Sequence, residues 1–296
     1  NNGSDDVFVS KLNSTLPTLS ASTFVGGIGG DYSYGIVLDS SGNLYITGGA
    51  ASGFPTTAGA YDETHNGGTD VFIAKLNTTL TTLSASTFFG GASTDNGFGI
   101  TLDASNSNLY VAGQARSSDF PTTAGAYDET HNGVDDVSVS KLNSTLTTLS
   151  ASTFIGGSGD DQGKNIIIDS SGNVYVTGYA ATGFPTTAGA YDETHNGGSR
   201  DAFVSKLNST LTTLSVSTFI GSSSNFDEGD AILLDSSGNV YVTGIAGSGF
   251  PTTSGAYDET QNGSTDVFVS KLNSTLTTLS VSTFIGGSGA DEGHGI

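Results

Sequence analysis

The sequence predicts an all-β protein built from one repeated unit of four short antiparallel strands. Three observations lead to this prediction: a motif that recurs every 64 to 66 residues, four strand-like runs within each unit, and no helical apolar period over ten or more residues. The repeat is marked by Asp-Val-Phe-Val-Ser-Lys-Leu-Asn, of which closely similar copies begin at Asp6, Asp70, Asp136, Asp201 and Asp266. Such units bury their apolar faces against their neighbours, so a stacked array is expected.

The four strands are clearest in the third complete unit. Residues 165–169 and 173–177 are predicted to form the first two strands, because both are apolar runs joined by the Asp, Gly and Asn of a tight hairpin turn. After a longer loop, residues 202–207 and 214–220 are predicted to form the third and fourth strands. Alternation supports the strand assignment: in the first copy Phe8 and Leu12 share one face, and Val7 and Val9 share the other.

Four-stranded antiparallel units of about 65 residues are typical of the blades of a β-propeller, and an open β-stack or superhelix of the same units is the alternative. The predicted boundaries are residues 1–29 for the second half of a blade, 30–94, 95–159, 160–225 and 226–290 for four blades, and 291–296 for the start of the next. All belong to one repeat domain of about five repeats, of which one is incomplete, lacking the 29 residues equivalent to Val37 through His65. We expect either a window cut from a longer array or a half-unit completed by a neighbouring chain.

Composition excludes several classes of protein. The chain holds 29 Asp and Glu against 8 Lys and Arg, for a formal charge of −21, which argues against binding to nucleic acid or anionic lipid. It contains no Cys, so thiolate chemistry, disulfides and cysteine metal sites are excluded. No apolar run is long enough for a membrane-spanning helix. The known catalytic sequence motifs are absent and the acidic pairs recur in every unit, so we expect no enzyme activity.

Several motifs within each unit carry a resemblance to a known family. They are the first strand with its Asp-Ser-Ser-Gly-Asn turn, the second strand Val-Tyr-Val-Thr-Gly, the loop Phe-Pro-Thr-Thr, the third strand Asp-Ala-Phe-Val-Ser-Lys-Leu-Asn and the fourth strand's Ser-Thr-Phe-Ile-Gly. Together they closely resemble the bacterial SBBP β-propeller repeat. The resemblance implies a β-propeller and an extracellular or cell-surface setting, and it brings no catalytic residues. The turn after Asn208 departs from the family, which usually has Pro, Ser and Gly there.

Acidic loops suggest a calcium site. In a propeller, the loops after the second and fourth strands share one face, and here both are rich in carboxylates. Carboxylate and amide oxygens in Gly-rich loops are the hard ligands that calcium prefers, although the spacing matches no known calcium motif, and a solvated acidic face is the alternative. The candidate ligands are Asp160, Asp161, Asp227, Glu228, Asp230, Asp291 and Glu292. Calcium is the one cofactor that the sequence suggests.

Lysine and histidine recur at fixed positions of the unit. We expect each lysine of the third strand to form an ion pair with the Asp that ends the first strand, namely Asp39, Asp169 or Asp235. These structural lysines are Lys11, Lys75, Lys141, Lys206 and Lys271. His65, His131 and His195 share one loop position, which Gln261 takes in the fourth copy, so they are interpreted as hydrogen-bonding residues and not as metal ligands.

Asn-x-Ser/Thr tripeptides also recur and are candidate glycosylation sites. Five occupy the same turn after the third strand, at Asn13, Asn77, Asn143, Asn208 and Asn273, and two more begin at Asn2 and Asn262. The alternative is that Asn and Ser make only local hydrogen bonds in the turn.

These features favour a non-enzymatic extracellular or cell-surface repeat protein that acts as a structural or scaffolding element. Its expected partners are further copies of itself, in a polymer or filament, or other surface proteins and glycans, because the open strand edge could pair with another chain. The alternative is a calcium-assisted module for adhesion that binds carbohydrate or protein through its acidic face.

Overall fold

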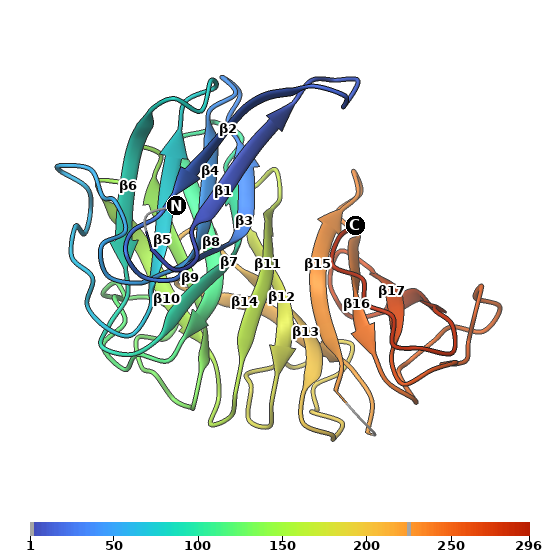
Figure 1. The fold of residues 1–296 in the computed structure, drawn as a ribbon. Helices are drawn as coiled ribbons and strands as arrows, with labels where there is room; N and C mark the ends of the chain where they lie inside the picture. Colours follow the sequence, from blue (N-terminus) through green and yellow to red (C-terminus); the bar gives the residue numbers. More distant parts are fainter. Residues whose placement is uncertain (1–2, 224–225) are drawn as a thin grey trace. The chain divides into compact units, whose positions relative to one another are not determined.

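The computed structural model of the protein describes residues 3–223 and 226–296, which form eighteen β-strands and no helix (Figure 1). Sixteen strands make four sheets of four strands each, and the first two strands form a two-stranded sheet. The prediction of an all-β chain of repeated four-stranded antiparallel sheets is therefore confirmed. No helix of the described residues is long and apolar enough to cross a membrane.

The strands follow the repeat in chain order. The two-stranded sheet consists of β1 (Val7–Leu12) and β2 (Leu19–Val25). The next sheets consist of β3 (Asp31–Leu38), β4 (Leu44–Ala50), β5 (Asp70–Leu76) and β6 (Leu83–Phe89), and of β7 (Asp95–Leu102), β8 (Asn108–Ala115), β9 (Asp136–Asn143) and β10 (Leu149–Ile155). The last two consist of β11 (Gln162–Ile168), β12 (Val174–Ala180), β13 (Asp201–Leu207) and β14 (Leu214–Ile220), and of β15 (Glu228–Leu234), β16 (Val240–Ala246), β17 (Asp266–Leu272) and β18 (Leu279–Ile285).

The hairpin between the first two strands of each sheet is fixed by its Asp and Gly. In the third complete repeat the Asp169 carboxylate accepts the backbone N–H groups of Ser171 and Asn173, both at 2.9 Å. Gly172 has a φ of 85°, a left-handed conformation that glycine adopts without steric cost. These local interactions set the register in which Ile168 pairs with Val174 and Ile166 with Val176.

The turn between the third and fourth strands uses a leucine where a glycine would be expected. Leu211 has a φ of 57°, and its N–H donates to the carbonyl oxygen of Asn208 at 3.0 Å. Its side chain is fully buried, and its carbonyl oxygen accepts the N–H of Tyr127 in the preceding repeat at 2.9 Å. Burial and this contact offset the cost of the left-handed backbone. The same φ occurs at Leu16, Leu80, Leu146 and Leu276.

By its internal contacts, the chain divides into two compact units, residues 1–123 with 140–152 and residues 124–139 with 153–296. In the second unit, a core cluster joins consecutive repeats: Val204 and Tyr175 of one pack with Ile232 and Val240 of the next. In the first unit, Val9 of β1 belongs to a cluster with Leu44, Ile46 and Phe72. Consecutive repeats therefore share apolar side chains, as in other repeat proteins.

Three of the complete sheets also carry an aromatic cluster beside the Phe-Pro-Thr-Thr loop. Phe184 of this loop lies with its ring centroid 4.5 Å from that of Phe203 and 5.9 Å from that of Phe219. The equivalent Phe250 lies 4.3 Å from Phe268 in the next repeat. The loop is thus packed onto the third and fourth strands of its own repeat and covers their apolar side chains.

Candidate functional site

Side chains that differ in chemistry between otherwise similar repeats gather at one end of the sheets. They come from the first strand, from the end of the second strand that pairs with it, and from the residues just before the first and third strands. Two positions of the first strand vary most. The first of these holds Tyr32, Asn96, Gln162, Glu228 and Glu292, and the second holds Tyr34, Phe98, Lys164, Asp230 and His294.

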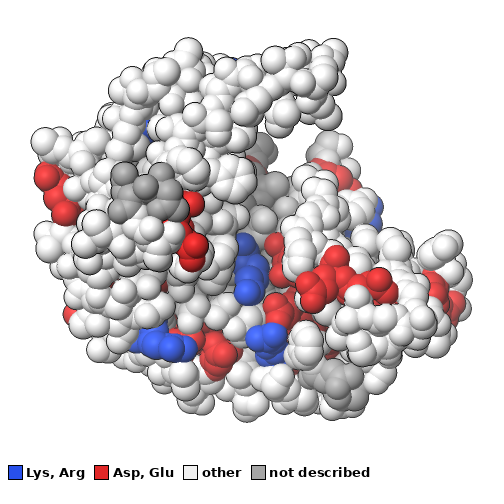
Figure 2. All heavy atoms as spheres, in the orientation of Figure 1, with Lys and Arg blue, Asp and Glu red and all other residues white. Residues whose placement is uncertain are grey.

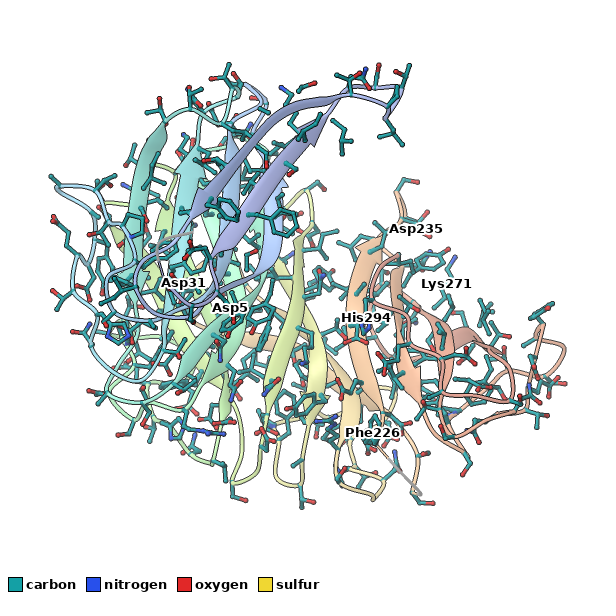
Figure 3. The ribbon with its side chains drawn as sticks, viewed as in Figure 1. Asp5, Asp31, Phe226, Asp235, Lys271 and His294 are labelled. Atoms are coloured by element: carbon teal, nitrogen blue, oxygen red, sulfur yellow. The ribbon has the colours of Figure 1, made fainter. Side chains whose placement is uncertain are left out.

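In the first unit, these variable positions are mainly aromatic. The ring centroids of Tyr34 and Phe98, which come from consecutive first strands, lie 4.9 Å apart. The Tyr32 hydroxyl donates to the Asp5 carboxylate at 2.9 Å, and this contact raises the pKa of the tyrosine. Asp5 and Asp31, the first residue of β3, are labelled in Figure 3, and the N–H of Asp31 donates to the carbonyl oxygen of Asp5 at 2.8 Å.

In the second unit, the same positions are charged. Nδ1 of His294 lies 3.5 Å from Oδ2 of Asp230, and its Nε2 lies 3.1 Å from Oε2 of Glu292. Lys164 and Glu228 also act electrostatically on Asp230. Burial and the nearby Glu228 charge raise the pKa of Asp230 to about 6, although His294 and Lys164 oppose the shift. Figure 2 shows basic and acidic side chains beside one another on the face that it presents.

Arg200 forms the second half of this charged cluster. Its guanidinium makes an ion pair with Glu228 and lies over two rings, with its Cζ 4.1 Å from the ring centroid of Tyr179 and 4.9 Å from that of Phe226. Phe226 and His294 are labelled in Figure 3. Burial raises the pKa of the Tyr179 hydroxyl, so this group stays protonated and remains a hydrogen-bond donor. We call Lys164, Tyr179, Arg200, Phe226, Glu228, Asp230, Glu292 and His294 the charged cluster.

The seven candidate calcium ligands divide into two groups. Glu228, Asp230 and Glu292 lie in the charged cluster, where Arg200 and His294 already contact them. Among residues 3–223 and 226–296, no group of three or more His, Asp or Glu side chains is arranged so that it could hold a metal ion. Calcium binding by these residues therefore stays a prediction.

Four of the candidates lie outside the charged cluster. Asp160 is exposed, and the other three, Asp161, Asp227 and Asp291, accept backbone N–H groups. Asp161 accepts the N–H groups of Gly157 and Ala181, each at 2.8 Å. Asp227 accepts those of Ser222 and Gly247, and Asp291 accepts that of Gly287 at 2.7 Å. Burial raises the pKa of Asp161 to about 7 and that of Asp227 to about 6. Each carboxylate ties the loop that precedes the first strand to its own repeat, which is a structural role.

The recurring lysines lie against an aspartate and a tyrosine of their own sheet. The Nζ–Oδ2 distances are 3.8 Å for Lys75 and Asp39, 3.8 Å for Lys206 and Asp169, and 3.4 Å for Lys271 and Asp235, a pair labelled in Figure 3. The same Nζ atoms lie 4.8 Å from the ring centroids of Tyr45, Tyr175 and Tyr241, and that of Lys141 lies 5.1 Å from Tyr110. Lys11 of β1 makes a different contact, to the carbonyl oxygen of Thr78 at 3.1 Å.

The three loop histidines pack edge-on against phenylalanine rings. The centroid distances are 5.7 Å for His65 and Phe88, 5.8 Å for His131 and Phe154, and 5.7 Å for His195 and Phe219. Burial lowers the pKa of His195, so it is neutral at pH 7. In the fourth copy, the Gln261 side chain donates to the carbonyl oxygen of Gly263 instead.

The asparagines of the five recurring tripeptides organise the turn in which they lie. The Asn208 side-chain oxygen accepts the N–H of Thr212 at 2.9 Å, and its amide group donates to the Thr212 hydroxyl, also at 2.9 Å. The contacts of Asn143 and Asn273 are the same. All five side chains are half-buried, and glycosylation there stays a prediction. Asn262 binds Asp258 in a loop, and Asn2 lies outside the described residues.

Sequence reasoning missed the basic and aromatic members of the charged cluster, namely Lys164, Tyr179, Arg200, Phe226 and His294. The signal that could have found them is the difference between repeats, because each of these residues replaces a chemically different one at the same position of the other copies. Motif searches do not detect such positions, since the residue there changes between consecutive copies.

One stretch of the chain, which contains β11, β12 and the hairpin between them, matches a known repeat. Residues 152–185 match the family model of SBBP, a beta-propeller repeat. This match confirms the resemblance over the fourth strand of one SBBP-like repeat and the first two strands of the next. No curated protein matches the chain.

Two of the solved structures that match the chain show a weak similarity to it. One is a GH43_12 retrieved from capybara gut metagenome, with a TM-score of 0.38 and 11% sequence identity over 86% of this chain and 41% of that chain. The other is a protein of unknown function from Bacteroides caccae, with a TM-score of 0.36 and 11% identity over 98% of this chain and 96% of that chain. The present chain thus spans about two fifths of the length of the first.

Proposed function

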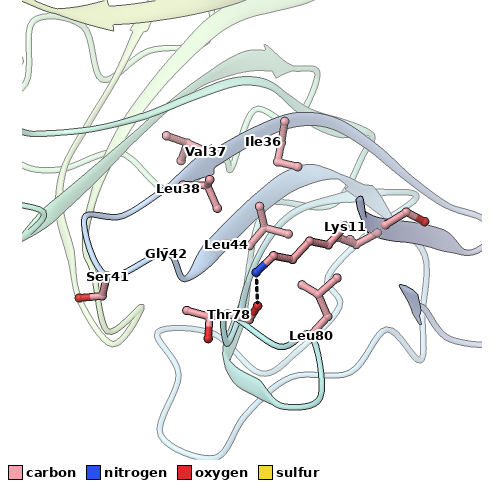
Figure 4. A pocket seen from close by; sticks show the side chains of 11 residues that line it. Lys11, Ile36, Val37, Leu38, Ser41, Gly42, Leu44, Thr78 and Leu80 are labelled. Atoms are coloured by element: carbon pink, nitrogen blue, oxygen red, sulfur yellow. Dashed lines mark hydrogen bonds between the residues drawn. The ribbon is translucent and has the colours of Figure 1, made fainter. Parts of the chain in front are cut away.

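We propose that the chain is a non-enzymatic structural or scaffolding protein of the cell surface or extracellular space, which assembles with neighbouring chains into a polymer or filament. The observation that supports this proposal most is a group of exposed large apolar side chains in the first unit. Phe8, Ile36 and Leu38 are 69%, 65% and 61% exposed, and Ile36 and Leu38 line the pocket shown in Figure 4. Exposed apolar side chains that lie together are typical of surfaces that associate with other proteins.

The repeat supports a scaffold over an enzyme. Consecutive copies present the same hydrogen bonds and ion pairs, and a β-propeller repeat model matches one stretch of the chain. A reaction needs a nucleophile or an acid–base pair at one place, whereas the paired acidic residues of the loops recur in each copy. A structural role instead benefits from identical contacts in every copy.

Sedimentation velocity tests the assembly at neutral pH. We expect the native chain to form species larger than a monomer whose proportion rises with concentration, and the variant Ile36→Lys to remain a monomer, because Ile36 lies on the exposed apolar surface next to β1. Tyr257→Lys is the matched control, since Tyr257 is 89% exposed in a loop of the other unit. A native chain that stays monomeric at all concentrations contradicts the proposal. Electron microscopy of the associated fraction tests the filament.

The charged cluster favours a second candidate, a module for adhesion that binds carbohydrate or protein with or without calcium. Within the described part of the chain, the buried Nε of Arg200 has no hydrogen-bond partner, and the buried Oδ2 of Asp230 has none beyond its contact with Nδ1 of His294 at 3.5 Å. Buried polar atoms are usually satisfied, so these two are candidate contacts for a polar ligand. We expect Asp230→Asn and His294→Gln to weaken such binding, and Asp235→Asn, in a hairpin outside the cluster, to leave it unchanged.

A glycan array and a set of surface proteins, each screened with and without chelator, test this second candidate. Binding that chelator abolishes supports the calcium-assisted form. Binding that chelator leaves unchanged but that Asp230→Asn removes supports recognition by the charged cluster alone. If neither screen detects binding, the adhesion module is contradicted and the structural scaffold remains the proposed function.

A further inference from the structure

The first strand of each complete repeat contains a β-bulge, at which one residue is skipped in the pairing with the second strand. The pairing of β11 with β12 skips Lys164, and that of β15 with β16 skips Asp230. In β3 and β7 the skipped residues are Tyr34 and Phe98. A bulge bends its strand and re-aims the side chain of the extra residue, and bulges are frequent next to functional positions.

The backbone of the bulge is supported in the same way in every complete repeat. A side chain on Gly178 of β12 would collide with the carbonyl oxygen of Gln162, two residues before Lys164. The glycines that make the same close approach in the other repeats are Gly48, Gly113 and Gly244. The bulge is therefore constant, whereas its residue differs in every copy. These bulge residues are Tyr34, Phe98, Lys164, Asp230 and, at the equivalent position after the fourth complete repeat, His294.

Bulge residues of consecutive repeats contact one another. The ring centroids of Tyr34 and Phe98 lie 4.9 Å apart in the first unit. In the second unit, Nδ1 of His294 lies 3.5 Å from Oδ2 of Asp230, and Lys164 acts electrostatically on the same carboxylate. Neighbouring bulges within each unit thus match in chemistry: ring lies against ring, and basic side chains lie against a carboxylate.

The other contacts between repeats do not distinguish one copy from another. Tyr127 donates to the Leu211 carbonyl oxygen of the next repeat, and this bond would form equally well with the turn of the fourth repeat, which has the same sequence. Arrays of similar repeats are prone to such misassembly. Stacking that skips one repeat would place Lys164 beside His294, two basic side chains. It would also place Phe98 beside Asp230, a ring against a largely buried carboxylate, which is unfavourable.

We propose that the bulge residues determine which repeat stacks on which, so that they are the specificity-determining residues of repeat–repeat recognition. The partner of each bulge residue is the bulge residue of one other repeat. Contacts common to all copies supply the stability of the stack, and the bulges penalise the wrong order. This inference goes beyond the proposed function, because it holds whether or not the chain assembles with other chains or binds a ligand.

Engineered cysteines can report the order of the repeats, because the chain contains no Cys of its own. Ala126→Cys with Thr212→Cys places two thiols beside the contact of Tyr127 with Leu211, so its cross-link reports the native order. Ala126→Cys with Thr277→Cys reports the wrong order, since Thr277 is the equivalent of Thr212 in the fourth repeat. Each chain is refolded from urea, treated with a short bismaleimide and analysed by mass spectrometry. Denaturing gels separate cross-links within a chain from those between chains.

The measured quantity is the ratio of wrong-order to native-order cross-links. Lys164→Asp makes the bulge residues of the third and fourth repeats alike and should raise this ratio about tenfold or more, because an attractive contact becomes repulsive. Asp230→Asn keeps the shape of the side chain and should raise the ratio in the same direction, even if Lys164→Asp does not fold. Lys206→Gln is the matched control: it removes the contacts of a lysine with Asp169 and Tyr175 in the same repeat and should leave the ratio unchanged.

Two results would overturn the inference. One is an unchanged ratio in both bulge variants. The other is an equal rise in Lys206→Gln, since any loss of stability would then have the same effect as a changed bulge. Lys164→Arg keeps the charge and should keep the native ratio. A native chain that stays monomeric in sedimentation velocity contradicts the scaffold but does not affect this ratio, so the two proposals fail separately.

Discussion

The carboxylate of Asp161 accepts the backbone N–H of Ala181 with one oxygen and that of Gly157 with the other, each at 2.8 Å. It thereby links the loop before β11 to the residue that follows β12. We expect Asp161→Ala to lower the free energy of unfolding by about 3 kcal/mol, because two buried N–H groups lose their acceptor. Urea unfolding measures the change. Ser170→Ala, at an exposed position of the hairpin in the same repeat, is the control and should change it by less than about 0.5 kcal/mol.

Stability should increase as the pH is lowered from 8 to 5. Burial raises the pKa of Asp161 to about 7, and those of Asp70, Asp201 and Asp227 to about 6, above the value of 3.8 for an unperturbed Asp. The folded chain therefore binds more protons than the unfolded chain between pH 4 and 7, so stability is lost as the pH rises through this range. Thermal unfolding at constant ionic strength should show a midpoint about 5 °C higher at pH 5 than at pH 8.

A midpoint that is independent of pH, or that falls on acidification to pH 5, contradicts this assignment of the buried carboxylates. The variant Asp161→Asn separates the buried group from the general charge of the chain. It should reduce the pH dependence between pH 5 and 8, whereas Glu259→Gln, in an exposed loop, should not.

His195→Gln should be nearly neutral for stability, within about 0.5 kcal/mol. The reason is that the fourth repeat already carries Gln261 at this position, with a hydrogen bond to Gly263 in place of a ring contact. His195→Ala should cost about 1 kcal/mol, because Phe219 loses the edge of the imidazole ring. Chemical denaturation compares the two variants. A large loss of stability in the His195→Gln variant would indicate that the imidazole has a role which Gln261 does not have in the fourth repeat.

Asn208→Ala should destabilise the chain by about 1 kcal/mol even when no glycan is attached, because the Asn208 side chain accepts two backbone N–H groups of the turn. Thr210→Ala removes the glycosylation tripeptide and keeps these bonds. Mass spectrometry of chain made in a glycosylating host tests modification at Asn208, and the mass shift at this site should be absent in both variants. A modified site in the Thr210→Ala chain would contradict this assignment.

Leu211→Gly should destabilise the chain by about 2 kcal/mol, although glycine is the better residue for a φ of 57°. The loss of a fully buried leucine outweighs the relief of the backbone. Urea unfolding measures the difference, and Leu16→Gly is the control. Leu16 has a φ of 67° but is 70% exposed, so this variant should be neutral or stabilising.

The sheets could be predicted because their determinants are local in the sequence. The apolar run Ile166 to Ile168 and the Asp169, Gly172 and Asn173 of the turn lie within a few residues of one another. The strands extend a few residues beyond the predicted ranges, to Gln162 in β11 and Ala180 in β12. The contact between Lys206 and Asp169 was also expected from the sequence. The chain has few cations, and the repeats carry the lysine and the aspartate at fixed positions of the third and first strands.

The roles of the acidic residues could not be predicted in the same way. Asp161 and Asp227 were candidate metal ligands, but they accept amides from loops 4 to 20 residues away, and the path of those loops is set by tertiary packing. Lys164, Asp230 and His294 lie far apart in the sequence and meet only because equivalent positions of consecutive first strands become neighbours. Repeat geometry, not residue type, brings this part of the candidate site together.

The contact of Tyr127 with the Leu211 carbonyl oxygen joins one repeat to the next, and Tyr191 binds Leu276 in the same way at 2.8 Å. These two junctions therefore share the same backbone hydrogen bond. Gain or loss of one whole copy during replication of the gene would recreate the same hydrogen bond, and copy number can drift without loss of this contact. Loss of a fraction of a copy leaves a mismatched junction, so lineages of such a gene should differ by multiples of one period.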